Sequence, residues 1–449
     1  MSVMEWGART ARRRFNPQHL AWAVLLSGFA LFCLLFVTVL LSANHFLFLS
    51  SLPMDAVLSV GRGTVGISDL ANPLEQVGIT GSEIADGVIV RTDPQSQGTI
   101  QFLDDVGSER RLLVALTLQR DSRVTLLSAE RPRFSWSRSS YEITLQDVIG
   151  VINLTVTEHA GPWLRILGRT PGGARLELLG PGSYTLQGAA PELRLFNHDG
   201  NALLESPDGQ VVRVVPAGRQ GAVLYEESRV ELRPGYINML ADPQFTLLNT
   251  GSDPAEGGAW ACGHKLNDLH PGTHDFVSVD GLSPIRFRRD QGVKSHGLNI
   301  CSQNFGPSGL NLRQLNLERL FLRATFSLKH ASLASCGIEG SECPLMFRMD
   351  YIYVDEDDNE RKGEVWYHGF FIRQREEWPL RCDTCLQNHE LIHDNSWYVY
   401  ESPDLLTLFA PEPPPETIVS ISFYASGHEY DVLVHNVALL AQPVFMLDV

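Results

Sequence analysis

The sequence predicts a mainly β protein in which two β regions follow a single N-terminal membrane-spanning helix. Charged residues are absent from Phe15 to Met54. Short alternating apolar runs separated by Gly, Pro and Asp then fill residues 51–235, and aromatic residues, His and Cys become commoner from about residue 236. We therefore expect a basic tail over residues 1–19, a transmembrane helix over 20–41, one β region over 51–235 and a β-sandwich over 236–449.

The apolar run from Leu20 to Leu41 is interrupted only by Ser27, Gly28 and Thr38. It matches the roughly 20 apolar residues that cross a bilayer. The core of a cleavable signal peptide is shorter, roughly 7–15 residues, and a small-x-small cleavage site follows it, whereas no clear one follows here. We expect an uncleaved anchor in the cell membrane.

Charge predicts the orientation of this anchor and excludes one class of partner. Arg9, Arg12, Arg13 and Arg14 precede the helix, and the next basic residue after it is Arg62. This asymmetry places the amino terminus in the cytoplasm and the bulk of the chain outside. The whole chain has a net charge of −16. Nucleic acid is not an expected partner, because phosphate binding requires a basic face.

The first β region has the pattern of adjacent antiparallel strands. Thr99–Phe102, Leu193–Phe196 and Val211–Val215 are typical of its short runs. Asp199-Gly200 and Asp208-Gly209 each stand between apolar runs, and Gly accepts the positive φ of a tight turn. Both pairs predict hairpin turns.

Three segments of this region form a recognisable pattern: Gly81–Asp93 (GSEIADGVIVRTD), Pro181–Leu186 (PGSYTL) and Pro216–Gln220 (PAGRQ). In these segments the region resembles the FecR-like β-domain of bacterial envelope proteins. It spans about 140 residues on the usual layout of that family. FecR-like domains occur in sensors that control a cytoplasmic sigma factor, so the resemblance makes a transmembrane sensor one alternative. A tail of about 19 residues is short for a folded partner domain.

The second β region has the outline of a sandwich. In Leu320–Leu328 every second residue is apolar, which places five side chains on one face of a strand. Met346–Val354 and Ile418–Tyr424 predict further strands.

Two segments of this region form a recognisable pattern, Ile237–Phe245 (INMLADPQF) near its start and Tyr430–Leu439 (YDVLVHNVAL) near its end. They are similar to the opening motif and the closing strand of the jelly-roll carbohydrate-binding modules of polysaccharide-degrading enzymes. The chain departs from the family by a long insert before Trp260 and by Asn436 in place of the usual closing Asp. The resemblance implies a jelly-roll fold and suggests a glycan as ligand.

Six of the seven cysteines lie in the second β region, and the seventh, Cys33, lies in the apolar helix. An even set outside the cytoplasm favours disulfides. The alternative is a tetrahedral zinc bound by the last four thiolates. The disulfide interpretation favours two local bonds, Cys336 with Cys343 and Cys382 with Cys385, together with Cys262 and Cys301, although the sequence alone leaves the connectivity open. The zinc interpretation uses Cys336, Cys343, Cys382 and Cys385.

The segment His389–His393 fits the His-Glu-x-x-His pattern, in which one helix presents two imidazoles to zinc and Glu390 acts as base. The pattern requires a helix of several turns. Here Cys385 lies four residues upstream and the turn-prone Asp394-Asn-Ser follows directly. A chance match in a loop of the sandwich is the favoured interpretation.

Four aromatic residues with polar neighbours are the candidate ligand-binding residues: Trp366, Tyr367, Trp397 and Tyr424. Flat rings suit stacking on sugars, and the competing interpretation is that they build the core of the sandwich.

Together these patterns predict a non-catalytic, membrane-anchored envelope protein that binds a glycan or another envelope protein through its C-terminal sandwich. No catalytic motif has a confirming context, so neither an enzyme nor a cofactor is expected. The alternatives are a sensor of the FecR type and an extracytoplasmic zinc hydrolase that uses His389, Glu390 and His393.

Overall fold

The structure is a computed structural model of the chain. It describes residues 17–70, 74–106, 109–134, 136–137, 139–246, 248–249, 259–264, 270–279, 282–290, 295–338, 340–355, 360–383, 385, 389–407 and 414–444. The described residues form two compact units. One contains the chain up to Leu52 with Arg131–Ser140, and the other contains Pro53–Glu130 with Tyr141–Val449.

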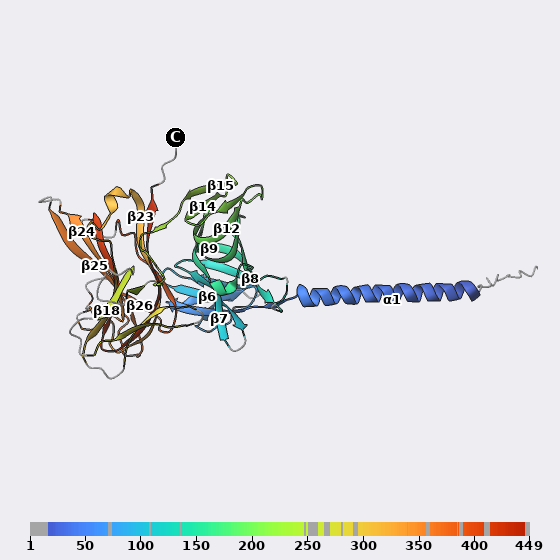
Figure 1. Ribbon diagram of the computed structural model, residues 1–449, viewed down its shortest axis with the longest axis horizontal. Helices are drawn as coiled ribbons and strands as arrows, with labels where there is room; N and C mark the ends of the chain where they lie inside the picture. Colours follow the sequence, from blue (N-terminus) through green and yellow to red (C-terminus); the bar gives the residue numbers. More distant parts are fainter. Residues whose placement is uncertain are drawn as a thin grey trace, which may run out of the picture. The chain divides into compact units, whose positions relative to one another are not determined.

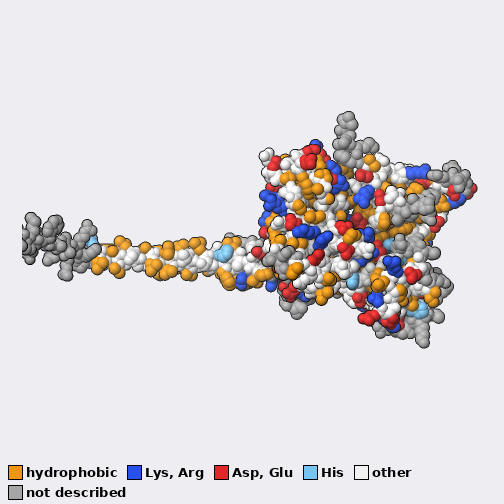
Figure 2. Space-filling view, turned by 180° about the vertical axis from the view of Figure 1, so that it is seen from behind, with side chains coloured by type: hydrophobic (Ala, Val, Ile, Leu, Met, Phe, Trp, Pro, Cys, Tyr) orange, Lys and Arg blue, Asp and Glu red, His pale blue; other side chains and the backbone are white. Residues whose placement is uncertain are grey.

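The first unit is built on helix α1, Pro17–Phe48 (Figure 1). Its 32 residues correspond to about 48 Å at 1.5 Å per residue. Within the described residues it is the one helix long and apolar enough to span a membrane, with a mean hydropathy of 2.8. Apolar side chains cover it along its length (Figure 2). The expected helix over 20–41 is present and extends further at both ends, whereas residues 1–16 of the expected tail lie outside the described residues.

The first β region forms one 15-stranded sheet, with the main path β15-β14-β12-β11-β10-β9-β8-β5-β3-β4 and with β2, β6 and β7 joined to it through β9. Its strands are β1 Ser51–Pro53, β2 Asp55–Arg62, β3 Val65–Asp69, β4 Gln76–Gly78, β5 Val88–Thr92, β6 Gln97–Val106, β7 Glu109–Leu118, β8 Arg123–Pro132, β9 Glu142–Val156, β10 Arg165–Arg169, β11 Arg175–Ala189, β12 Glu192–Glu205, β13 Val212–Val215, β14 Arg219–Leu224 and β15 Arg229–Pro234.

One of the two predicted hairpin turns is confirmed, and the other is wrong. Asp208-Gly209 joins antiparallel strands β12 and β13, and Gly209 has φ +73°. Asp199-Gly200 instead lies inside β12, where the pairing with β11 is irregular. The Tyr184 hydroxyl explains this difference, because it accepts a hydrogen bond from Asn201 N at 3.0 Å and a Cβ at Gly200 would lie only 2.2 Å from it. Gly200 therefore makes room for a buried ring and not for a chain reversal.

The second β region forms two sheets. The six-stranded sheet has the order β19-β20-β29-β23-β27 with β16 on β29, and the eight-stranded sheet has the order β17-β18-β21-β28-β24-β25-β26 with β22 on β28. The strands are β16 Ile237–Asn238, β17 Leu248–Asn249, β18 Trp260–His264, β19 Thr273–Phe276, β20 Ile285–Arg289, β21 Gly297–Asn304, β22 Leu310–Asn311, β23 Leu317–Ala331, β24 Leu345–Val354, β25 Arg361–Ile372, β26 Glu390–Ile392, β27 Tyr398–Glu401, β28 Thr417–Gly427 and β29 Tyr430–Pro443.

Each β region has its own hydrophobic core. One core contains residues from Met54 to Val230, and the other contains residues from Leu240 to Ala441. In β23 the alternate residues from Leu320 to Leu328 are all buried in the second core, as the apolar alternation predicts. The mainly β fold class and the sandwich-like arrangement are confirmed.

Candidate functional site

The six-stranded sheet is covered on its outer face by the first β region. Phe321 of β23 meets the ring of Tyr236 edge-on at 4.9 Å, and Tyr236 stacks on Phe196 of β12 at 4.4 Å. Ala438 and Leu440 of β29 complete this buried cluster. Aromatic contacts of this kind stabilise an interface beyond the area they bury. This face of the sandwich is therefore occupied by the chain itself.

A buried carboxylate forms the second contact between the two β regions. Glu390 begins β26, and its side chain is only 12% exposed. Arg62, at the end of β2, donates a hydrogen bond to Glu390 Oε2, and the Tyr398 hydroxyl donates to the same oxygen at 2.7 Å. Arg120 Nη2 lies 3.9 Å from Oε1. A charge at this depth is tolerated only with partners of this kind.

A backbone contact next to this cluster links the same two regions. The Gln97 side-chain amide of β6 donates to Val399 O at 2.7 Å, and its carbonyl oxygen accepts from Val399 N at 2.9 Å. Gln97 thereby pairs with β27 much as a neighbouring strand would. The site around Glu390 therefore joins two sheets.

The surroundings of Glu390 keep it ionised. Burial alone would raise its pKa, but His368, Arg62 and the Tyr398 hydroxyl outweigh that effect and lower the pKa to about 2. His368 Nε2 is buried and lies 3.5 Å from Glu390 Oε1.

The lowered pKa predicts a loss of stability in acid. The pKa of Glu390 in the folded state lies below its ordinary value of 4.5. Its contribution to the free energy of unfolding is therefore complete above pH 4.5 and is lost as the pH falls toward 2. We expect this group to account for up to about 3 kcal/mol of acid destabilisation. Denaturation of the full chain and of Glu390→Gln at pH 7, 4.5 and 3 measures it. If both proteins lose the same stability between pH 4.5 and 3, Glu390 is not the responsible group.

The zinc arrangement expected from the His-Glu-x-x-His pattern is not formed. Residues Glu390–Ile392 are a β-strand and not a helix, so the backbone between the two histidines lacks the helical turn that brings both imidazoles to one ion in this pattern. His389 Nδ1 accepts from Gly369 N at 3.0 Å, whereas His393 Nε2 lies 3.1 Å from Gly63 O. Glu390 is held by Arg62 and Tyr398. The helix on which the hydrolase alternative rests is therefore replaced by a strand.

The six cysteines of the sandwich lie in three pairs at disulfide distance: Cys262–Cys301, Cys336–Cys343 and Cys382–Cys385. This pairing matches the disulfide interpretation. The last two pairs lie together with Met346, Phe371 and Tyr424 in a small cluster, which we call the disulfide cap. The free cysteine is Cys33 in α1.

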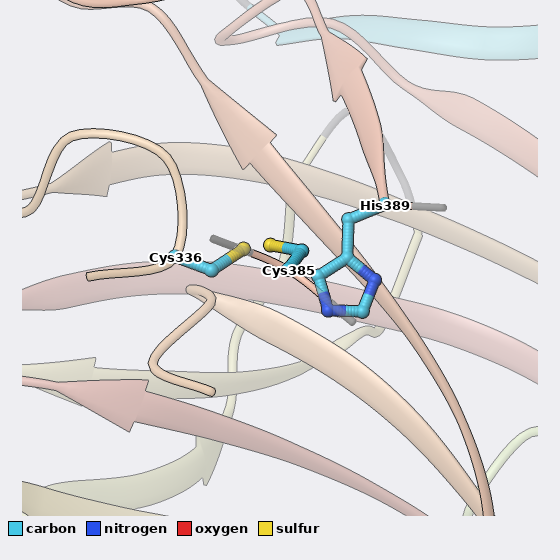
Figure 3. A group of neighbouring side chains, drawn as sticks. All are labelled: Cys336, Cys385 and His389. Atoms are coloured by element: carbon cyan, nitrogen blue, oxygen red, sulfur yellow. The ribbon is translucent and has the colours of Figure 1, made fainter. Parts of the chain in front are cut away.

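Figure 3 shows a group with metal-ligand chemistry, made of two cysteines of the disulfide cap and His389. The sulfur atoms of Cys336 and Cys385 and one ring nitrogen of His389 all lie within 4.8 Å of one another. Burial and the neighbouring His368 lower the pKa of His389 to about 4, so its ring is neutral near pH 7. Metals bind thiolates, and both sulfurs are held in disulfides. The group could bind a metal only after both bonds were reduced.

The outer face of the eight-stranded sheet carries a polar row that crosses four strands. The strand register places Ser302 of β21, Ser422 of β28, Arg348 of β24 and Tyr367 of β25 side by side. The Arg348 guanidinium lies 5.7 Å from the centre of the Tyr367 ring. The Ser422 hydroxyl bonds the Ser302 hydroxyl at 2.9 Å. Four adjacent strands make this row about 14 Å wide.

Asp350 fixes the polar row from the adjacent position on β24. It accepts hydrogen bonds from Arg348 Nε at 3.1 Å and from the Ser420 hydroxyl at 2.7 Å. The side chains of Arg348 and Asp350 are 37% and 26% exposed. The hydrogen bonds from Arg348 to Asp350 raise the pKa of the guanidinium, which remains charged. This arrangement holds a planar cation, a carboxylate and a ring ready for a polar ligand.

The four candidate aromatic residues do not form one platform. Trp366 belongs to the sandwich core, and Trp397 is buried beside His435. Tyr424 is also buried, under the disulfide cap. Tyr367 is only partly buried and lies in the polar row. Trp366 and Tyr367 differ because consecutive residues of a strand point to opposite faces.

Sequence reasoning missed Arg348, Asp350, Ser302 and Ser422. A signal for the first two was present, since they interrupt an apolar strand at alternate positions and must share its outer face. The contribution of β21 and β28 depends on strand order and register, which no local pattern contains. Arg62 was also missed, because it lies 328 residues from Glu390.

A groove adjoins the disulfide cap. Its volume is about 770 Å³, and its lining includes Ile338, Glu342, Arg381, Asp383 and His428. The side chains are mixed in charge, and Ile338 is 90% exposed.

Comparison with known proteins gives likenesses at low similarity only. No protein family and no curated protein matches the sequence. A candidate anti-sigma factor from Parabacteroides distasonis is 11% identical over 33% of this chain, with a TM-score of 0.23, and the match spans 59% of its own length.

Carbohydrate-binding modules also occur among the similar structures. A family 11 module from Clostridium thermocellum, solved with a β-1,3-1,4-mixed-linked tetrasaccharide, is 12% identical over 43% of this chain and 95% of its own, with a TM-score of 0.23. A family 22 module of the same organism is 11% identical over 42% and 89%, with a TM-score of 0.20. Likenesses of this size establish neither fold nor function.

Proposed function

We propose that this chain is a non-catalytic, membrane-anchored envelope protein that binds a glycan on the outer face of its eight-stranded sheet. The observation that carries the proposal is the polar row, in which Ser302, Ser422, Arg348 and Tyr367 stand side by side on four strands. The opposite face of the sandwich is covered by the first β region through Phe321 and Tyr236. The polar row is thus the face left for a ligand.

The chemistry of the polar row suits a sugar. A sugar ring offers hydroxyl groups in its plane and C–H groups on its faces. Arg348 supplies fixed donors, Asp350 and the partly exposed Ser302 hydroxyl supply acceptors, and Tyr367 supplies a flat apolar surface, whereas Ser422 is buried and holds Ser302 in place. Because Arg348 is already oriented by Asp350, little side-chain entropy is lost when a ligand binds.

Binding of the full chain in mild detergent to a glycan array that includes peptidoglycan fragments tests this function. Arg348→Ala is expected to weaken binding at least tenfold, because a hydrogen bond from a charged donor contributes about 1.5–3 kcal/mol and each 1.4 kcal/mol is a factor of ten. Tyr367→Ala is expected to weaken it as well.

Arg286→Ala is the matched control. Arg286 makes a similar paired contact with Asp431 on the six-stranded sheet, where the two side chains are 27% and 20% exposed. Its removal costs comparable stability without touching the polar row. Equal affinity of Arg348→Ala and Arg286→Ala would exclude the row as the glycan site. A folded full chain that binds no glycan on the array would favour an envelope protein as partner.

Helix α1 is the proposed membrane anchor, with the amino terminus in the cytoplasm. The apolar run supports the anchor, and the arginines that precede it support the orientation. A protease added to inverted vesicles should remove an N-terminal tag, whereas removal of that tag from right-side-out cells would contradict the orientation.

A further inference from the structure

A short excursion of the first β region packs against the end of the membrane helix. It lies between β8 and β9 and belongs to the same compact unit as α1. The ring of Phe134 meets that of Phe46 at 5.8 Å. The Ser137 hydroxyl lies 3.4 Å from Leu47 O, and Arg133 N donates to Ser50 O at 3.2 Å. Three kinds of contact therefore attach this excursion to the last turn of α1 and to the residues that directly follow it.

This excursion exposes an aromatic surface. Trp136 stacks on Phe134 at 5.0 Å, with the ring planes only 4° apart, and remains 61% exposed. The Arg133 guanidinium lies 5.0 Å from the centre of the Phe46 ring. A Trp, two Phe rings and an Arg thus gather around one helix end. We call Arg133, Phe134 and Trp136 the aromatic wedge.

The position of Phe46 along α1 gives the depth of the aromatic wedge. The apolar run ends at Leu41, and Phe46 lies five residues further, or about 7 Å along the helix axis. The hydrocarbon core of a bilayer is about 30 Å thick and the whole bilayer about 40–45 Å, which leaves about 5–7 Å of headgroup layer on each side. With Leu20–Leu41 in the hydrocarbon core, the wedge is level with the headgroups.

We propose that the aromatic wedge is a second membrane contact, in which Trp136 and Phe134 insert into the headgroup layer and Arg133 pairs with lipid phosphate. Trp is enriched at this depth because its ring is apolar and its N–H is polar, and Arg is suited to phosphate. This inference rests on the proposed role of α1 as an anchor. With the wedge inserted, the first unit contacts the membrane at two places, α1 and the aromatic wedge. Rotation of α1 about its axis would therefore pull the rings out of the headgroup layer.

The test measures lipid contact by fluorescence quenching in vesicles of phosphatidylcholine and phosphatidylglycerol. The full chain carries an environment-sensitive label at Ser137→Cys, with Cys33→Ala in the background. Nitroxide lipids with a shallow or a deep quencher report depth, and aqueous iodide reports exposure to water. We expect the label to be quenched at least twofold more by the shallow lipid than by iodide. Phe134→Ala with Trp136→Ala is expected to reverse this preference.

Two controls keep the outcomes separate. Trp163→Ala removes a Trp that is 75% exposed outside the wedge and should leave the quenching unchanged. A label on the native Cys33, near the middle of the apolar run, should be quenched by the deep lipid.

If Cys33 is quenched but position 137 responds only to iodide, the second contact is overturned and the anchor stands. If Cys33 is not quenched by lipid, the anchor itself fails. Shielding of position 137 from both lipid and iodide means that protein covers the wedge, which also overturns the inference.

Discussion

Replacing Arg62 by Ala is expected to lower the free energy of unfolding of the full chain by about 3 kcal/mol. The substitution removes the cation that contacts Glu390 most closely and leaves a carboxylate that is 12% exposed. Arg120 cannot compensate, because it lies 3.9 Å from Glu390 and is itself 60% exposed. Removing one partner of a buried ion pair costs more than the pair contributes, because the remaining charge stays desolvated. Urea denaturation in mild detergent measures the loss.

An exposed ion pair provides the comparison for Arg62. Arg110 lies 3.6 Å from Asp55, and both side chains are more than half exposed. Arg110→Ala should cost less than about 1 kcal/mol. The double variant Arg62→Met with Glu390→Met should recover most of the loss, because it leaves no buried charge. If Arg62→Ala and Arg110→Ala cost the same, or if the double variant loses as much as Arg62→Ala, Glu390 does not hold the two β regions together by charge.

Loss of the disulfide between Cys262 and Cys301 is expected to cost about 4 kcal/mol, the largest effect we anticipate for a covalent contact. The two residues are directly paired across β18 and β21 and are 39 residues apart in sequence. The bond lowers the conformational entropy of the unfolded chain, and this effect increases with the logarithm of that separation. The variant Cys262→Ala with Cys301→Ala, compared with the parent by thermal and urea denaturation, measures the cost.

The Cys382–Cys385 disulfide is the internal reference for that measurement. Its residues are only three apart in sequence, so the same reasoning gives about 2 kcal/mol for its removal. Cys382→Ala with Cys385→Ala should therefore be clearly more stable than the Cys262 and Cys301 variant. Equal losses, or the reverse order, would show that local packing and not chain entropy sets the value of these bonds.

The contrast between β23 and the polar row shows how far local patterns reach. The alternate apolar residues from Leu320 to Leu328 form a buried face, because a strand turns successive side chains to opposite sides wherever it lies. The same alternation separates Trp366 from Tyr367, although residue type alone had grouped them. Both residues are aromatic, but their positions on the strand decide which of the two side chains is exposed to solvent.

The segment at Glu390 shows a different kind of limit. Its residues match a zinc-helix pattern, yet the backbone is extended and pairs in parallel with β25. A motif specifies the chemistry of its residues but not the secondary structure that would make them converge. Here pairing with β25 gives the segment an extended backbone, and Arg62, from the opposite end of the chain, is the partner of the carboxylate.

By itself the sequence determined the apolar helix, the mainly β class and the apolar faces of individual strands, and it grouped six cysteines in the second β region. These features depend on residues close together in the chain, or on composition, and both are visible without a fold. The tertiary structure alone decided that Arg62 meets Glu390, that four strands bring Ser302, Ser422, Arg348 and Tyr367 into one row, and that Phe134 and Trp136 meet the end of α1. Such contacts join residues far apart in sequence. Strand order and register determine which contacts form, and both arise only when the whole core packs.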